Sequence, residues 1–217
     1  MSYGIRMRDQ DIDNMIARYP QLRVCYKEIY RVYKTICNSF ETGHKLLICG
    51  NGGSCADSQH IVGELMKSFM IPRNMLEEDR RRLIEVYGDN GVIMSEKLEK
   101  GLPAISIDSM PVISSAISND IDSDYVYAQV LYNYGIEGDV LLGISTSGNA
   151  VNVNHALKLA KILGIKTVGL TGNNGGKMNK VCDEVIHAPS DVTYEIQEYH
   201  ISIYHTLCIM VEKYFFL

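Results

Sequence analysis

The sequence predicts a doubly wound α/β domain, in which helices cover both faces of a parallel β-sheet. Short, continuously apolar segments recur along the chain, and helical patterns separate most of them. Continuous apolar runs are typical of central parallel strands, and their alternation with helices favours a three-layer fold. The chain has 217 residues, 46% of them hydrophobic, which suffices for one sizeable core. We therefore expect a single domain over residues 1–217.

The first predicted element is a helix that precedes the first strand. Over residues 20–43, apolar and aromatic side chains recur at steps of 4 and 3 residues, which places them on one helix face. These positions are Leu22, Tyr26, Ile29, Tyr33, Ile36 and Phe40. A helix in front of the first strand cannot belong to a strand–helix–strand crossover. We therefore expect the helical segment 8–43 to pack on partner subunits.

Five predicted strands follow, with helical patterns between most of them. The strands are KLLICG (45–50), PAISI (103–107), DVLLGIS (139–145), KTVGLTG (166–172) and DEVIHA (183–188). The helical patterns cover residues 55–69, about 110–135, 149–163 and Thr193 to Phe216. This alternation completes the predicted doubly wound sheet.

A charged segment at about 70–102 interrupts the alternation. It carries helix signals around 76–87 and 92–100, which Gly-Asp-Asn-Gly divides. We interpret the segment as a helical insertion over the C-terminal edge of the sheet. It would serve either as a lid or as a solvated surface hairpin.

The composition argues against several classes of protein. The net charge is −5 and no long basic run occurs, which disfavours a nucleic-acid partner. No apolar run approaches the roughly 20 residues of a membrane-spanning helix, and the opening MSYGIRMRDQ lacks the apolar core of a signal peptide. The six cysteines form no C-x-x-C pair, which suits a reducing compartment. We expect a cytoplasmic protein without a membrane partner.

Polar turns that contain glycine follow three of the predicted strands. They are Asn51-Gly52-Gly53-Ser54, Ser145-Thr146-Ser147-Gly148-Asn149 and the Thr171–Gly176 segment. In parallel α/β sheets, ligands bind beyond the C-terminal ends of the strands, where loop N–H groups point outward. The hydroxyls of Ser145, Thr146 and Ser147 would form an anion cradle at a helix N-terminus. An ordinary N-cap cluster is the alternative, because these residue types favour caps.

Two pairs of polar side chains could meet near this cradle. His60 and Glu64 share one face of helix 55–69 because they are four residues apart. Gln197 and His205 return to roughly one face of the last helix. If the two helices pack side by side, the four side chains form a set suited to acid–base catalysis or to a divalent metal. Taken alone, a helical histidine is more often a packing residue.

Four motifs occur in order over nearly the whole chain apart from the insertion. They are CGNGGS-x-x-D-x-x-H-x-x-x-E-L, GISTSGN, LTG-x-x-GGKM and IQE-x-H-x-x-x-x-H. The set resembles the sugar isomerase (SIS) fold and, within it, the sedoheptulose-7-phosphate isomerases, also called phosphoheptose isomerases. GISTSGN is typical of the wider sugar-phosphate-binding fold. The combination with His60, Glu64, Gln197 and His205 is much more specific to the phosphoheptose isomerases.

The resemblance implies a flavodoxin-like five-stranded sheet and a homotetramer whose active sites are shared between subunits. It implies that Glu64 and His205 are the catalytic acid–base pair. It also implies a Zn²⁺ ion in some members, held at the positions of His60, Glu64, Gln197 and His205. The implied substrate contacts are Asn51, Gly52, Gly53, Ser54, Asp120, Ser145, Thr146, Ser147 and Gln197.

The function that the resemblance implies is an aldose–ketose isomerase for a phosphorylated sugar. Sedoheptulose 7-phosphate would become a heptose 7-phosphate through a cis-enediol. Three residues depart from the family pattern: Ser68 replaces an arginine, Tyr194 an aspartate and Ala150 a serine. The alternatives are therefore another phosphosugar, a non-catalytic sugar-phosphate-binding regulator, or a lyase or etherase on an amino-sugar phosphate. Arg73 or the Arg80–Arg82 cluster could replace the missing guanidinium.

Overall fold

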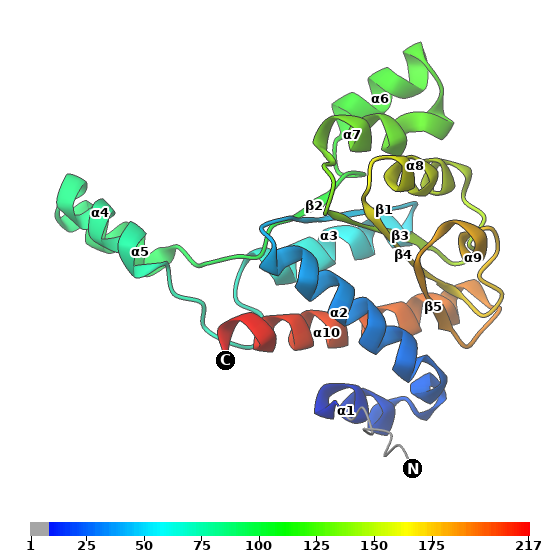
Figure 1. Ribbon diagram of the computed structural model, residues 1–217, viewed down its shortest axis with the longest axis horizontal. Helices are drawn as coiled ribbons and strands as arrows, with labels where there is room; N and C mark the ends of the chain where they lie inside the picture. The colour runs from blue at the N-terminus through cyan, green and yellow to red at the C-terminus, as the bar shows by residue number, and fades with distance from the viewer. Residues whose placement is uncertain (1–8) are drawn as a thin grey trace.

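A five-stranded parallel β-sheet with helices on both faces forms the centre of the computed structural model, which describes residues 9–217 (Figure 1). The strands are β1 (Leu46–Gly50), β2 (Ala104–Ser106), β3 (Val140–Ser145), β4 (Lys166–Gly172) and β5 (Glu184–Ala188). Their order in the sheet is β2-β1-β3-β4-β5, which is the flavodoxin-like order. The predicted fold class and the five predicted strands are confirmed.

Ten α-helices and two short 3₁₀ helices surround the sheet within the described residues. The α-helices are α1 (Gln10–Arg18), α2 (Tyr26–Glu41), α3 (Gly53–Met66), α4 (Glu77–Tyr87), α5 (Asp89–Lys97), α6 (Pro111–Asp120), α7 (Val126–Tyr134), α8 (Val151–Ile162), α9 (Met178–Val181) and α10 (Thr193–Phe216). The 3₁₀ helices are η1 (Pro20–Cys25) and η2 (Ser123–Tyr125). The pattern predicted at about 110–135 is divided because Asp122 accepts a hydrogen bond from the N–H of Asp124 and starts a new turn.

The core consists of two apolar clusters, one on each face of the sheet. Along β1, Leu46 and Ile48 belong to the cluster that includes α2, α3 and α10, whereas Leu47 and Cys49 belong to the cluster that includes α7 and α8. Successive side chains of a strand point to opposite faces, so a continuously apolar strand supplies both clusters. This explains why the strands could be recognised from apolar runs.

The N-terminal segment packs on the protein's own sheet. Leu22 and Ile29 are 0% exposed and Ile36 is 3% exposed, and all three belong to the cluster that contains α10. The predicted apolar face is therefore covered within the chain, because α2 lies against β5 and α10 on that side of the sheet. Packing of segment 8–43 on partner subunits remains a proposal, and it would have to use the other faces of these helices. Residue 8 lies outside the described residues.

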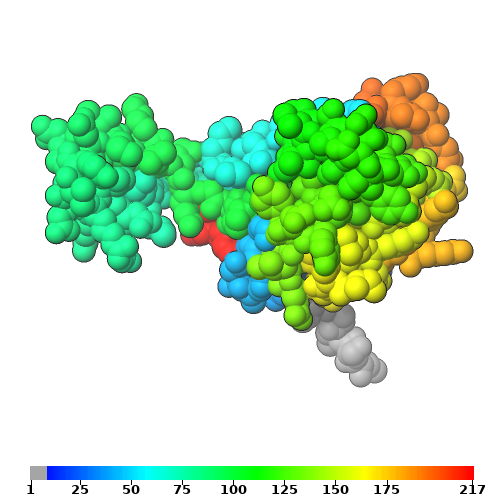
Figure 2. All heavy atoms as spheres, turned by 90° about the horizontal axis from the view of Figure 1, so that it is seen from above, coloured from blue at the N-terminus to red at the C-terminus, as the bar shows by residue number. Residues whose placement is uncertain are grey.

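The insertion at 70–102 forms a helical hairpin, α4 and α5, which projects from the body of the molecule (Figures 1 and 2). The chain leaves the hairpin at the N-terminal edge of the sheet, where Pro103 O accepts a hydrogen bond from the N–H of Leu46. The prediction that it covers the C-terminal edge is wrong. The insertion connects the end of α3 to the start of β2, and parallel strands all start at the same edge. The structure supports the surface hairpin over the lid.

Within residues 9–217, none of the helices combines the length and the apolar character that a membrane crossing requires.

Candidate active site

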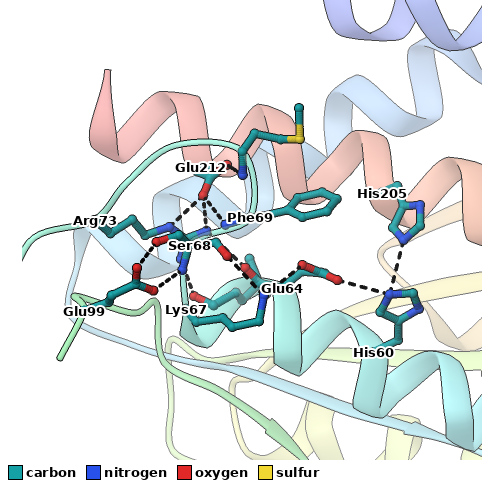
Figure 3. A network of polar contacts seen from close by, with 11 residues as sticks. His60, Glu64, Lys67, Ser68, Phe69, Arg73, Glu99, His205 and Glu212 are labelled. Atoms are coloured by element: carbon teal, nitrogen blue, oxygen red, sulfur yellow. Dashed lines mark hydrogen bonds and ion pairs between the residues drawn. The ribbon is translucent and has the colours of Figure 1, made fainter. Parts of the chain in front are cut away.

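His60, Glu64 and His205 come together where α3 packs against α10 (Figure 3). His60 Nε2 lies 3.1 Å from Glu64 Oε1 and 3.4 Å from His205 Nε2. One ligand atom from each of the three residues lies within 4.8 Å of the others. The predicted meeting of the two helices is therefore confirmed. We call these three residues the histidine cluster.

Close contacts at both ends of α3 hold the two helices together. At the start of α3, a Cβ added to Gly53 would lie 2.3 Å from Gln197 Nε2, so a larger residue there would displace the Gln197 amide. At the other end, the buried Arg73 donates a hydrogen bond to Glu64 O (3.0 Å) and another to Glu212 Oε1 of α10 (2.8 Å) (Figure 3). The guanidinium thus ties the C-terminus of α3, where Glu64 lies, to the helix that carries His205.

Glu64 and His205 both have the capacity to accept a proton in this environment. Glu64 Oε2 is buried without a hydrogen-bond partner among residues 9–217, and Lys67 Nζ lies 3.8 Å from it. Burial, and then the charge of His60, lower the pKa of His205 below its usual value, although Glu64 opposes this shift. His205 is therefore held in its neutral form, which can accept a proton or bind a metal.

The histidine cluster is also suited to a metal ion. Two imidazoles and a carboxylate are a donor set that zinc prefers, and Glu64 Oε2, which has no hydrogen-bond partner among the described residues, has an oxygen lone pair available at that point. The donor chemistry of the three residues therefore fits zinc.

Gln197, the fourth predicted ligand, lies apart from the cluster. Its amide packs on Gly53 at the start of α3. It precedes His205 by eight residues in α10, which is about 12 Å along a helix axis. The spacing returns Gln197 to the same face of α10 but not to the same height. Within one chain, the structure brings together three of the four predicted metal ligands.

The predicted phosphate cradle lies at the C-terminal end of β3. Gly148 has φ +65°, and a Cβ there would lie 2.0 Å from Gly175 O, so the cradle turn packs directly on the turn after β4. Thr146 and Ser147 line a pocket together with Asn173 and Ser190. Ser145 is buried, at 6% exposure, at the base of this turn. Polar groups and a close backbone approach suit this turn to an anion.

The first glycine turn is held by hydrogen bonds. Asn51 Oδ1 accepts hydrogen bonds from Tyr127 OH (2.8 Å) and Asn152 Nδ2 (3.0 Å). Gly52 has φ +56°, and Ser54 is buried at the start of α3. Asp120 lies instead at the exposed end of α6, where Asn119 donates a hydrogen bond to its carboxylate (2.7 Å).

The first glycine turn lies at the start of α3, whereas the histidine cluster uses residues of its middle and of its C-terminal end. Glu64 follows Gly53 by eleven residues, which is about 16 Å along the helix axis. The prediction that the cluster flanks the cradle therefore stays a prediction. The turns occupy the C-terminal edge of the sheet, whereas α3 runs back toward the N-terminal edge and carries Glu64 with it.

Two arginine roles considered from the sequence are not supported. The Arg73 guanidinium is engaged with Glu212 and with the carbonyl of Glu64, so it cannot replace the missing family arginine. The arginines of the Arg80–Arg82 cluster pair with Glu77 and Glu78 of their own helix, on the projecting hairpin. The family position itself, Ser68, donates its N–H to the carboxylate of Glu99 (2.7 Å).

Tyr204 contacts the cluster and Asp57 contacts Tyr204, and neither residue was assigned a role from the sequence. The hydroxyl of Tyr204 lies 2.9 Å from His60 Nδ1 and 3.3 Å from Asp57 Oδ1. Burial raises the pKa of Asp57 to about 6, although Tyr204 and His60 oppose the shift. The signals in the sequence were the position of Asp57 one helical turn before His60 and that of Tyr204 directly before His205.

The chain is similar to known proteins of one family. SIS domain family profiles match residues 83–172 and 134–212. Phosphoheptose isomerase from Aliarcobacter butzleri is 38% identical over 180 residues, which are 83% of this chain and 82% of that protein. A probable phosphoheptose isomerase from Thermoplasma volcanium is 39% identical over 187 residues, 86% of this chain and 82% of that protein.

A solved structure agrees with these relatives. Phosphoheptose isomerase from Neisseria gonorrhoeae superimposes with a TM-score of 0.73 at 27% identity, covering 94% of this chain and 96% of that one. The fold and the family profiles together define a SIS domain protein. The identity to the curated relatives is more specific. The chain belongs to the phosphoheptose isomerase family.

Proposed function

We propose that the protein is an aldose–ketose isomerase that converts sedoheptulose 7-phosphate to a heptose 7-phosphate. The observation that carries the proposal is the histidine cluster, in which a carboxylate with a free oxygen and a neutral imidazole lie side by side. Membership of the phosphoheptose isomerase family supports the substrate class. The six free cysteines suit a reducing cytoplasm.

The proposed reaction moves one proton between two neighbouring carbons. One of Glu64 and His205 removes the proton from the carbon beside the carbonyl group while the carbonyl oxygen gains a proton, which gives a cis-enediol. The carbon-bound proton then returns to the former carbonyl carbon as the neighbouring hydroxyl group loses its proton and becomes the new carbonyl group. The low pKa of His205 keeps it available as a base or hydrogen-bond acceptor. Zinc held by His60, Glu64 and His205 would act as a Lewis acid that polarises the substrate oxygens.

The substrate phosphate would bind in the Ser145–Ser147 cradle, and Asn51 and Asp120 would orient hydroxyl groups. Within one chain, Glu64 follows Gly53 of the first glycine turn by about 16 Å along α3, which carries it away from the edge of the sheet where the cradle lies. We therefore propose that a homotetramer completes each active site, with the cradle and the acid–base pair contributed by different subunits. This arrangement would also give Gln197 and Asp120 a substrate or metal contact from a neighbouring subunit.

The test is turnover of a panel of ketose phosphates by the zinc-supplemented protein, with product analysis. Sedoheptulose 7-phosphate should give an aldose isomer of the same mass. The variants E64Q and H205A should each lose about 10²–10⁴-fold in kcat, the contribution expected of a general acid or base, while keeping the circular dichroism spectrum of the wild type. The absence of any isomerised product across the panel would refute the proposal, and a cleaved product would identify a lyase or etherase.

A further inference from the structure

Tyr204 links His60 to a second carboxylate, that of Asp57. Tyr204 is 1% exposed on α10, and its ring stands edge-on to the rings of His60 (centroids 5.5 Å apart) and His205 (5.0 Å). Its hydroxyl lies 2.9 Å from His60 Nδ1 and 3.3 Å from Asp57 Oδ1. The hydroxyl therefore stands between a ring nitrogen of the histidine cluster and a carboxylate that is itself only 7% exposed.

The surroundings of Asp57 determine which way this hydrogen-bond chain runs. The Tyr204 hydroxyl has one proton, which it can donate to His60 Nδ1 or to Asp57 Oδ1. Asp57 Oδ2 has no hydrogen-bond partner in the described part of the chain, so donation to His60 would leave the buried carboxyl group with neither oxygen satisfied. Leaving such a group unpaired is costly. When a cation at the histidine cluster takes the lone pairs of Glu64 and of His60 Nε2, the hydroxyl therefore donates to Asp57 Oδ1, and its oxygen accepts the Nδ1–H of His60. Without a cation, Glu64 Oε1 competes for a proton on Nε2, because Glu64 Oε2 has no hydrogen-bond partner in the described part of the chain.

This direction fixes the tautomer of His60. A neutral imidazole with its proton on Nδ1 has a lone pair on Nε2, and Nε2 is the atom that lies 3.1 Å from Glu64 Oε1 and 3.4 Å from His205 Nε2. Metal-bound histidines commonly donate their other ring N–H to a carboxylate or carbonyl in this way. Here a tyrosine hydroxyl transmits the effect of the carboxylate.

We propose that Asp57 and Tyr204 are positioning residues that hold His60 as the Nδ1–H tautomer, so that its Nε2 lone pair faces the histidine cluster. The inference rests on the zinc site of the proposed function, but not on the isomerase reaction. Neither residue needs to contact the substrate. Their effect would be seen in the state of His60 and in zinc affinity, apart from turnover.

The experiment compares Y204F with Y214F in the full-length protein. Y204F removes only the hydroxyl and keeps the ring. Y214F is the matched control, because the Tyr214 hydroxyl also donates to a carboxylate, that of Glu41, from the same helix α10. Zinc affinity is measured by chelator competition. Y204F should bind zinc about 10–100-fold more weakly than the wild type, and Y214F should match the wild type.

Histidine side-chain ¹⁵N NMR in the presence of zinc ions reads the tautomer directly. The wild type and Y214F should carry the His60 proton on Nδ1. In D57A, the Tyr204 hydroxyl loses its carboxylate and turns to donate to Nδ1, so the proton should move to Nε2. This variant also tests the proposal if Y204F fails to fold.

A wild-type His60 protonated on Nε2 alone would overturn the inference, as would equal zinc affinities for Y204F and Y214F. An inactive protein that shows the expected tautomer and zinc affinities would reject the isomerase and leave the inference standing. If the protein is an active isomerase but Y204F binds zinc as tightly as the wild type, the inference is rejected and the proposed function stands.

Discussion

His200 lies in the same motif as His205, yet its surroundings give it a structural role. It is 0% exposed on α10, and its Nε2 lies 3.3 Å from Thr171 O at the end of β4. Burial lowers its pKa to about 4, although the contact with Thr171 opposes the shift. The folded protein therefore holds His200 neutral, and the imidazole joins α10 to the sheet rather than taking part in chemistry.

This burial predicts a loss of stability in mild acid. The unfolded chain binds a proton at His200 below a pH of about 6.5, while the folded chain does so only near pH 4, so the unfolded state gains as the pH falls between these values. The stabilisation is complete above the unfolded pKa. By this linkage, His200 should remove about 3 kcal/mol from the free energy of unfolding between pH 6.5 and 4.

H200Q keeps a side-chain donor but does not titrate, so its unfolding free energy should fall less steeply over that range. Urea unfolding at a series of pH values measures the slope. H155Q is the control for losing a histidine elsewhere in the fold. A slope in H200Q equal to that of the wild type would contradict the assignment.

The sequence identified the parts of the candidate site that lie within one helical turn of each other. His60 and Glu64 share a face of α3 because side chains at i and i+4 are neighbours, and this pairing is present in the structure. Gln197 lies apart from this pair within one chain, because helical periodicity gives the face of a residue but not its distance from another helix. Tyr204 was missed because only the packing of α10 on α3 brings its hydroxyl to His60.

At the scale of elements, the turn after β3 depends on close backbone packing. Gly148 has φ +65°, and a Cβ added there would lie only 2.0 Å from Gly175 O. Gly43, after α2, also has positive φ, at +81°, but a Cβ there would meet nothing within 4 Å. A substitution at Gly43 therefore introduces backbone strain alone, whereas the same substitution at Gly148 adds a clash between the two turns.

We expect G148A to weaken phosphate binding and G43A to leave it unchanged. Both variants should lose about 1–2 kcal/mol of stability from the left-handed backbone, but only G148A should push the cradle turn away from the turn after β4. The measurement is KM for the ketose phosphate, which should rise at least about tenfold in G148A, equivalent to about 1.4 kcal/mol of binding. Equal KM values in the two variants would mean that the cradle does not hold the phosphate.

The strands were predictable because central parallel strands are apolar on both faces, as Leu46 and Leu47 illustrate. The helices were less predictable where they are short or divided. The four residues of α9 give no periodicity, and the Asp122 cap splits the region at about 110–135. The insertion was recognised as helical, but its side of the sheet follows from topology rather than from residue pattern.

At the scale of the whole molecule, metal binding should be visible as thermal stabilisation. A ligand that binds only the folded state adds about 2.7 kcal/mol at a free concentration 100 times its Kd, which for a chain of this size is a rise in Tm of about 5–10 °C. We expect zinc to raise Tm by this amount. Magnesium, which prefers oxygen ligands, should have little effect.

H205A supplies the control for this measurement, because it removes one imidazole from the cluster. Its Tm should not respond to zinc at the same concentration. A rise equal to that of the wild type would place the metal at other residues. Differential scanning fluorimetry with chelated protein as the starting point is sufficient for the comparison.

The projecting hairpin also makes the protein open to engineering. Asn74 and Glu99 bridge its base next to the body, so the turn at Gly88, which has φ +56° and is exposed, lies at the far end of the antiparallel pair. Exposed loop tips tolerate inserted sequence best. A reporter or affinity peptide spliced at Gly88 would extend away from the glycine turns, so the enzyme could be tethered to a surface or made fluorescent without altering its catalytic residues.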